Sequence, residues 1–129
     1  MESFLKINAP EIYAVPIQDN GEPLVDLLID YPDVFVDQTR DYAQNISKSI
    51  SCLRRQVAER LQQAAIQLPS GIRFKIVECH RSLEAQRHIF AEVMDDVKKD
   101  HPNWNEQEIY NETSTFVAPP DNTPPHSTG

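Results

Sequence analysis

Four histidines, His80, His88, His101 and His126, are the side chains of this chain best suited to metal binding or acid–base chemistry. Imidazole is the commonest metal ligand in proteins and titrates close to neutral pH. Most single histidines are nevertheless structural or solvated, so their surroundings decide between these roles. His88 lies within a helical pattern and is expected at the surface, and His101 precedes a proline and is expected in a turn.

His126 differs from the other three histidines in its surroundings. It lies in the Pro-rich segment 120–129 and directly follows Pro124 and Pro125. Two prolines limit the number of conformations that the chain loses on binding. The small residues after the histidine allow the backbone to approach a bound ion closely. The pattern indicates either one ligand of a metal site or a frayed Pro-rich segment.

Arg81 is the second residue whose position indicates chemistry. It follows the alternating stretch 72–78 and precedes an expected helix start, a place where a cleft can form. A guanidinium there can bind a substrate carboxylate or stabilise a developing oxyanion. The alternative is an ion pair with Glu78 or Glu84. His80, beside it, either lines the same cleft or packs inside the fold.

Hydrophobic periodicity predicts the elements that carry these residues. Apolar and polar residues alternate over 72–78, which indicates a strand. Apolar residues spaced by four and three predict a helix over 51–68, with the charged residues facing largely away. The apolar face comprises Leu53, Val57, Leu61, Ala64 and Leu68, and the residues facing away are Arg54, Arg55, Glu59 and Arg60.

Two further helices are expected after Arg81. Ser82 can cap a helix that carries an apolar stripe and ends, behind two lysines, before Pro102. Asn105 and Glu108 form a capping-box pattern at the start of the next helix. That helix should end before Ala118, because two prolines follow.

The N-terminal part is less regular. Residues 1–23 contain several breakers, and the apolar piece 12–17 within them could form an edge strand. Short strands are expected over 24–29 and 34–36. Strands and helices are thus mixed without regular alternation, which favours a single α+β domain over residues 1–129.

Composition and charge narrow the class of protein. The net charge of −8 argues against binding to nucleic acid or to an anionic membrane. No apolar stretch reaches the length of about 20 residues that a membrane helix needs. Met1 is not followed by a secretory pattern, so we expect a cytoplasmic location and free thiols at Cys52 and Cys79.

Four regions, taken in their order and spacing, resemble the D-alanyl-D-alanine dipeptidases, the zinc enzymes known from vancomycin resistance. The stretch 53–61 is similar to an early helix of that family, and Ile76-Val77-Glu78-Cys79-His80-Arg81-Ser82 is similar to its strand ending in an acidic-x-Tyr-Arg-Pro motif. The segments 101–104 and 116–120 follow in the expected order. Pro124-Pro125-His126-Ser127-Thr128-Gly129 is similar to the opening of the zinc motif, Ser-x-His-x6-Asp.

The resemblance implies an α+β fold of the type shared by the hedgehog signalling domain and D,D-carboxypeptidases. It implies one zinc, held by two histidines and one aspartate, and hydrolysis of D-alanyl-D-alanine by zinc-bound water with a glutamate as general base. His126 corresponds to the first zinc ligand and Arg81 to the arginine that stabilises the transition state. The aspartate would fall at position 133, beyond Gly129, and the remaining groups further downstream.

The chain departs from the family pattern at two positions, since His80 and Ser82 stand where the family has Tyr and Pro. Loss of the proline loosens the turn that aims Arg81. We therefore expect these residues by themselves to bind zinc poorly and to lack activity, unless a complementing C-terminal segment supplies the missing groups. The alternatives are a non-catalytic truncated remnant and an acidic interaction module that uses the Arg81 cleft without metal.

Overall fold

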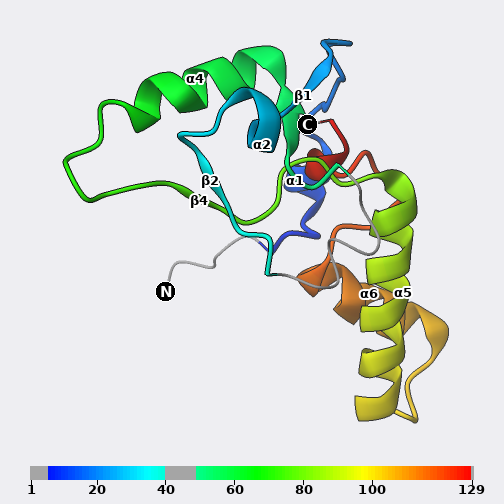
Figure 1. Cartoon of the computed structure of the whole chain (residues 1–129). Helices are drawn as coiled ribbons and strands as arrows, with labels where there is room; N and C mark the ends of the chain where they lie inside the picture. Colours follow the sequence, from blue (N-terminus) through cyan, green and yellow to red (C-terminus); the bar gives the residue numbers. More distant parts are fainter. Residues whose placement is uncertain (1–5, 40–48, 129) are drawn as a thin grey trace, which may run out of the picture. The chain divides into compact units, whose positions relative to one another are not determined.

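The structure, a computed structural model, describes residues 6–39 and 49–128 (Figure 1). The chain divides into two compact units. The helical unit comprises Met1–Ile17 and Leu83–Pro124, and the mixed unit comprises Gln18–Ser82 and Pro125–Gly129. The expectation of a single domain over the whole chain stays a prediction.

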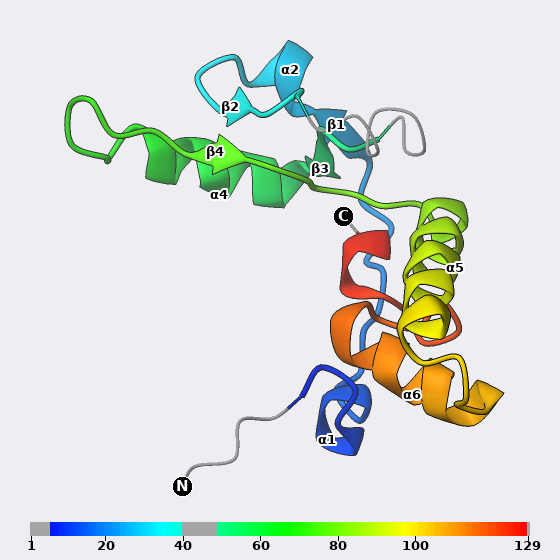
Figure 2. The same cartoon turned by 90° about the horizontal axis from the view of Figure 1, so that it is seen from below.

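The described part of the helical unit contains α1 (Pro10–Tyr13), α5 (Leu83–Asp100) and α6 (Glu106–Phe116). The helices α5 and α6 lie side by side in both views (Figures 1 and 2). Phe90 and Val97 of α5 and Ile109 of α6 are buried, and the rings of Phe90 and Tyr110 meet at a centroid distance of 5.4 Å. This seam confirms the apolar stripe that the sequence predicts for α5.

The start of α6 is the capping box that the sequence predicts. The Asn105 side chain accepts a hydrogen bond from the Glu108 backbone at 3.0 Å, and the Glu108 carboxylate accepts one from the Asn105 backbone at 2.8 Å. Two backbone donors near the helix start are thereby satisfied. The helix ends at Phe116, before Ala118, as expected.

The edge strand expected over 12–17 is absent, and that prediction is wrong. Pro10 begins α1, where its fixed φ angle suits the first helical turn and its missing N–H costs no hydrogen bond. Residues 14–17, which follow the helix, belong to neither a helix nor a strand.

Among the described residues, no helix combines the length and the apolar character needed to cross a membrane.

The mixed unit contains two small sheets, each with two described strands. In one sheet β1 (Leu24–Asp26) pairs antiparallel with β3 (Cys52–Arg54), and in the other β2 (Phe35–Val36) pairs in parallel with β4 (Lys75–Ile76). Its described helices are α2 (Leu27–Asp30), α4 (Arg55–Ala65) and the short 3-10 turn η1 (Pro125–Ser127). Helices combined with small sheets confirm the expected α+β class at this coarse level. The sheet was expected to be small and antiparallel, which holds for β1 and β3, whereas β2 and β4 are parallel.

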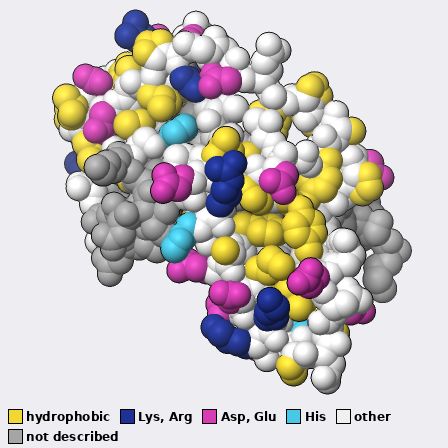
Figure 3. Space-filling view, turned by 90° about the vertical axis from the view of Figure 1, so that its right-hand side faces the viewer, with side chains coloured by type: hydrophobic (Ala, Val, Ile, Leu, Met, Phe, Trp, Pro, Cys, Tyr) yellow, Lys and Arg dark blue, Asp and Glu magenta, His cyan; other side chains and the backbone are white. Residues whose placement is uncertain are grey.

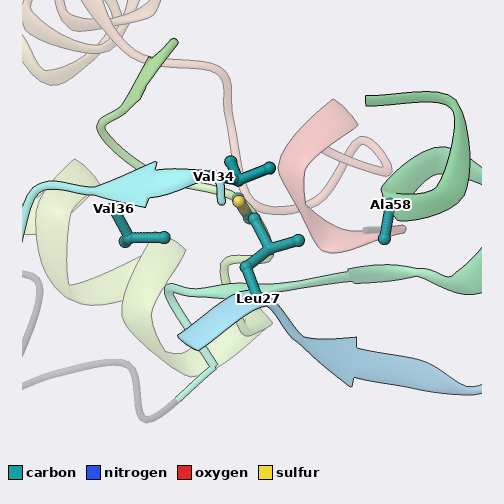
Figure 4. Close-up of a cluster of buried hydrophobic side chains, with 5 residues drawn as sticks. Leu27, Val34, Val36 and Ala58 are labelled. Carbon is teal, nitrogen blue, oxygen red and sulfur yellow. The ribbon is translucent and has the colours of Figure 1, made fainter. Parts of the chain in front are cut away.

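The hydrophobic core of the mixed unit gathers side chains from α2, the β2 strand, α4 and the segment after β4 (Figure 4). Its buried members are Leu27, Val34, Val36, Ala58 and Cys79. The backbone N–H of Cys79 also donates to the carbonyl of Ile50 at 2.8 Å. The segment that leads to Arg81 is therefore anchored in the core by both its side chain and its backbone.

Three predicted elements are shorter in the structure. The helix expected over 51–68 begins only at Arg55, because residues 52–54 pair with β1 as a strand. The strand expected over 72–78 is reduced to β4, since two of its residues pair with β2. The strand expected over 24–29 ends at Asp26, whose carboxylate accepts the N–H of Leu28 at 3.0 Å and so caps α2. The strand expected over 34–36 is confirmed as β2.

The buried face of α4 also differs from the prediction. It centres on Ala58, which has no exposed surface, and on Leu61. Val57, expected on the apolar face, is 45% exposed. Arg54, expected to face away, has only 14% of its side chain exposed. The apolar spacing is compatible with burial of the Val57 face or of the Ala58 face of α4. Packing against the core buries the face of Ala58 and Leu61.

Candidate functional site

Arg81 and His126, the two residues that the sequence singles out, lie together in the mixed unit. The backbone N–H of Arg81 donates to the carbonyl oxygen of His126 at 2.8 Å. The ring nitrogen Nδ1 of His126 lies 2.8 Å from the carbonyl oxygen of Cys79, a residue 47 positions earlier in the chain. The turn η1 is thus joined to the end of the segment that follows β4.

The contact of His126 determines which of its ring nitrogens carries the proton. A carbonyl oxygen can only accept a hydrogen bond, so Nδ1 must be the donor in this contact. In the neutral ring, Nε2 then carries a lone pair that can bind a metal ion or accept a proton. Metal-binding histidines commonly have this arrangement, with the second ring nitrogen bonded to a carbonyl or a carboxylate.

The side chain of Arg81 forms a two-pronged ion pair with Glu78. The distances are 2.7 Å from Nε to Oε1 and 2.5 Å from the guanidinium NH2 nitrogen to Oε2. The two side chains are only 15% and 8% exposed. The ion pair anticipated as an alternative role for Arg81 is therefore present with Glu78. Because both oxygens of the Glu78 carboxylate are bonded to the guanidinium of Arg81, the carboxylate sets the plane of the guanidinium.

His80 is the half-buried member of this group. Its Nδ1 lies 2.6 Å from the hydroxyl oxygen of Ser49, and its backbone N–H donates to the carbonyl of Cys52 at 3.0 Å. Burial lowers the pKa of the His80 imidazole, while a hydrogen bond to the backbone of Ser127 acts in the opposite direction. Of the two roles left open by the sequence, these contacts favour packing inside the fold.

Arg54 also belongs to this site, although the sequence did not indicate it. Its Nε donates to the carbonyl oxygen of Thr128 at 2.6 Å. Its other guanidinium nitrogens bind the Asp19 carboxylate at 2.6 Å and the carbonyl oxygen of Glu22. Helical periodicity assigned Arg54 to the solvent side, and no motif around it gave a contrary signal.

The remaining histidines lie in the helical unit, where the structure agrees with the sequence. His88 is exposed on α5 and lies 3.3 Å from Glu92. His101 follows α5, and its ring stacks on that of Trp104 at a centroid distance of 3.7 Å and an interplanar angle of 6°. Neither contact indicates a metal site.

The described residues supply one histidine in the geometry of a metal ligand, but they do not make a complete metal site. Within 6–39 and 49–128, no three His, Cys, Asp or Glu side chains converge in the manner of a metal cluster. Burial raises the pKa of the Cys79 thiol to about 12, so this side chain is a protonated thiol at neutral pH when no metal is bound. A zinc site of the implied kind would need groups from outside these residues.

A groove of about 500 Å³ lies elsewhere in the mixed unit, along β2 and the segment 65–73 that joins α4 to β4. Its wall includes the exposed apolar side chains Phe35, Ile66 and Ile72. Neither Arg81 nor His126 lines it.

On the face drawn in Figure 3, basic side chains lie beside acidic ones among the described residues, without a continuous basic patch.

No family model, no curated protein and no solved structure matches this chain. The features that bear on function are thus the geometry around Arg81 and His126 and the sequence motifs that contain these two residues.

Proposed function

We propose that this chain carries part of the active site of a zinc D,D-dipeptidase, an enzyme of the cytoplasm that hydrolyses D-alanyl-D-alanine to two D-alanines. The fold proposed with this function is the hedgehog and D,D-peptidase type. In this proposal His126 is one zinc ligand, and zinc would supply the activated water when the ligand set is complete. The two remaining ligands and the general base come from a complementing segment.

The contact between the turn that carries His126 and the segment that leads from β4 to Arg81 is the observation that supports the proposal. The two residues were selected from separate motifs, and their backbones are joined at 2.8 Å. The bond from Nδ1 to the Cys79 carbonyl also leaves Nε2 as the nitrogen for a metal. A frayed Pro-rich segment, the alternative explanation of the same residues, would require neither contact.

Arg81 would act on the substrate through its charge. A dipeptide presents a carboxylate, and an oxyanion develops at its carbonyl during hydrolysis, so a guanidinium can bind either group. Glu78 keeps this guanidinium in one plane, which lowers the conformational entropy lost on binding. The ion pair also means that substrate must compete with Glu78 for the cation.

Zinc titration of the purified chain, followed by the NMR signals of the four histidine rings, tests the ligand assignment. We expect weak binding in which the His126 ring responds first, because one ligand cannot hold zinc tightly. His126→Ala should remove this response, and His88→Ala, a change at an exposed histidine of the helical unit, should leave it intact. A titration in which the His126 signal never moves would refute the assignment.

The activity is tested with an extended chain. The added segment carries an aspartate, a glutamate and a second histidine at the spacing of the family. We expect tight zinc binding and release of D-alanine from the extended chain, and neither from the 129 residues alone. In the extended chain, Arg81→Ala should lower kcat by about 100-fold or more, as loss of an oxyanion-binding group does. Arg73→Ala, at an exposed arginine of the same unit, is the matched control, and equal turnover by both variants would exclude the role of Arg81.

A second candidate function is an acidic interaction module without metal, and the groove along β2 is the observation that favours it. Its exposed apolar wall could receive a partner. The zinc titration distinguishes the dipeptidase from the interaction module. The interaction module predicts no response of His126 to zinc, and so does a non-catalytic remnant.

A further inference from the structure

The guanidinium of Arg54 connects three parts of the chain that are distant in sequence. It binds the carbonyl oxygen of Thr128, 74 positions later, and it binds Asp19 and the carbonyl of Glu22, more than 30 positions earlier. The side chain is 14% exposed, and the carboxylate of Asp19 balances its charge at 2.6 Å. A surface arginine with a merely solubilising role would show neither this burial nor this number of directed bonds.

The bond to Thr128 fixes one end of the turn that carries His126. Within this turn, the backbone N–H and the hydroxyl of Thr128 both point to the carbonyl oxygen of Pro125, at 3.3 Å and 3.0 Å. The residues from Pro125 to Thr128 therefore form a closed loop. Arg81 holds the same loop through the carbonyl of His126. Because the loop is held at the carbonyls of Thr128 and of His126, the imidazole of His126 has little freedom to move.

Arginine suits this task because of where Arg54 lies and because of the shape of its side chain. It is the last residue of β3 and directly precedes α4, so its backbone is fixed by two elements. A planar guanidinium donates in several directions at once, whereas the ammonium of a lysine acts as a single point charge. Replacement by lysine should therefore keep the charge near Asp19 and lose part of the geometry.

We propose that Arg54 is a positioning residue of the site, which holds the turn 125–128 so that the imidazole of His126 keeps its place beside the segment that leads to Arg81. The chemical meaning of this inference rests on the proposed function, but the positioning itself can be measured without zinc. Loss of a residue that holds the ligands of a metal site in place commonly lowers metal affinity by about 10- to 100-fold.

Hydrogen exchange of single amides in the 129-residue chain tests the positioning. In Arg54→Ala the Arg81 amide, which donates to His126, should exchange about 10- to 100-fold faster, the effect expected from losing a hydrogen bond to a charged donor. The Leu27 amide, which donates to Ser51 inside the mixed unit, should change much less. Arg54→Lys should give an intermediate result, and Arg55→Ala, at the exposed neighbouring arginine, should match the unsubstituted chain.

The outcomes separate this inference from the proposed function. Equal acceleration at Arg81 and Leu27 would reduce Arg54 to a general stabiliser and overturn the inference, as would unchanged exchange at Arg81. Should Arg54→Ala fail to fold, the comparison of Arg54→Lys with Arg55→Ala decides by the same criterion. A His126 ring that ignores zinc in the unsubstituted chain would refute the proposed function and leave the Arg54 result standing.

Discussion

At the scale of single residues, the site depends on Arg81 serving two neighbours at once. Its side chain is paired with Glu78 and its backbone N–H binds the carbonyl of His126. Both members of the ion pair are largely buried, so each charge has lost most of its hydration and is stabilised in part by the opposite charge of the other. Removal of one partner should therefore cost far more than the loss of a surface ion pair.

We predict that Glu78→Gln lowers the free energy of unfolding by about 3 kcal/mol, because it leaves the Arg81 charge buried without its carboxylate. Urea denaturation measures this change. Asp96→Asn removes the partner of Lys99 in an exposed pair of the same sequence spacing and should cost about 0.5 kcal/mol or less. Equal effects of the two substitutions would show that the Glu78–Arg81 pair behaves as a surface pair.

At the scale of helices and strands, some elements are specified by residues close together in the sequence, and others form only through pairing with a distant segment. The helix α6 begins at a capping box formed by residues three positions apart, and it was predicted with its start and end. By contrast, β4 consists of two residues that pair with β2, and the neighbouring residues of the same alternating pattern belong to no strand. Short strands of this kind depend on the partner more than on their own sequence.

We predict that Asn105→Ala destabilises the helical unit by about 1 kcal/mol, because it removes the side-chain acceptor for the Glu108 amide. Faster hydrogen exchange of the Glu108 amide and a lower urea midpoint should both report this loss. Asn103→Ala changes an exposed asparagine outside α6 and serves as the control. If the two variants have the same stability, the capping box does not contribute in solution.

At the scale of the whole molecule, the chain forms two compact units with separate apolar interiors. In the mixed unit Leu27 is fully buried and contacts a cluster that includes Cys79, from which the chain continues to Arg81. The core and the site are therefore parts of the same unit. A cavity in this core should weaken the anchor of the segment that holds His126.

We predict that Leu27→Ala lowers the free energy of unfolding of the mixed unit by about 2 to 5 kcal/mol, the cost of a large-to-small change in a packed core. Leu28→Ala, at the neighbouring residue with 43% exposure, should cost about 0.5 kcal/mol. Hydrogen exchange at the Arg81 amide checks the link with the site, because it should accelerate in Leu27→Ala. Similar losses for both leucines would contradict the core assignment.

The sequence by itself determined the features that depend on a few neighbouring residues. An apolar stripe indicated α5, the Asn105–Glu108 pattern and the prolines after Ala118 located the start and the end of α6, and the motifs indicated Arg81 and His126 as candidates. The helix signals arise within single elements, where the periodicity of one segment is enough to produce them. The candidates Arg81 and His126 came from motifs whose order and spacing along the chain can also be read without a structure.

Only the tertiary structure decided which face of α4 is buried, how short the paired strands are, and that Arg54 joins the site. The contact of His126 with Cys79 spans 47 positions and that of Arg54 with Thr128 spans 74. Such contacts depend on how the whole unit packs, because an apolar spacing is compatible with more than one buried face and a guanidinium can reach many acceptors. Local patterns carry no information about which of these alternatives gives the lowest free energy.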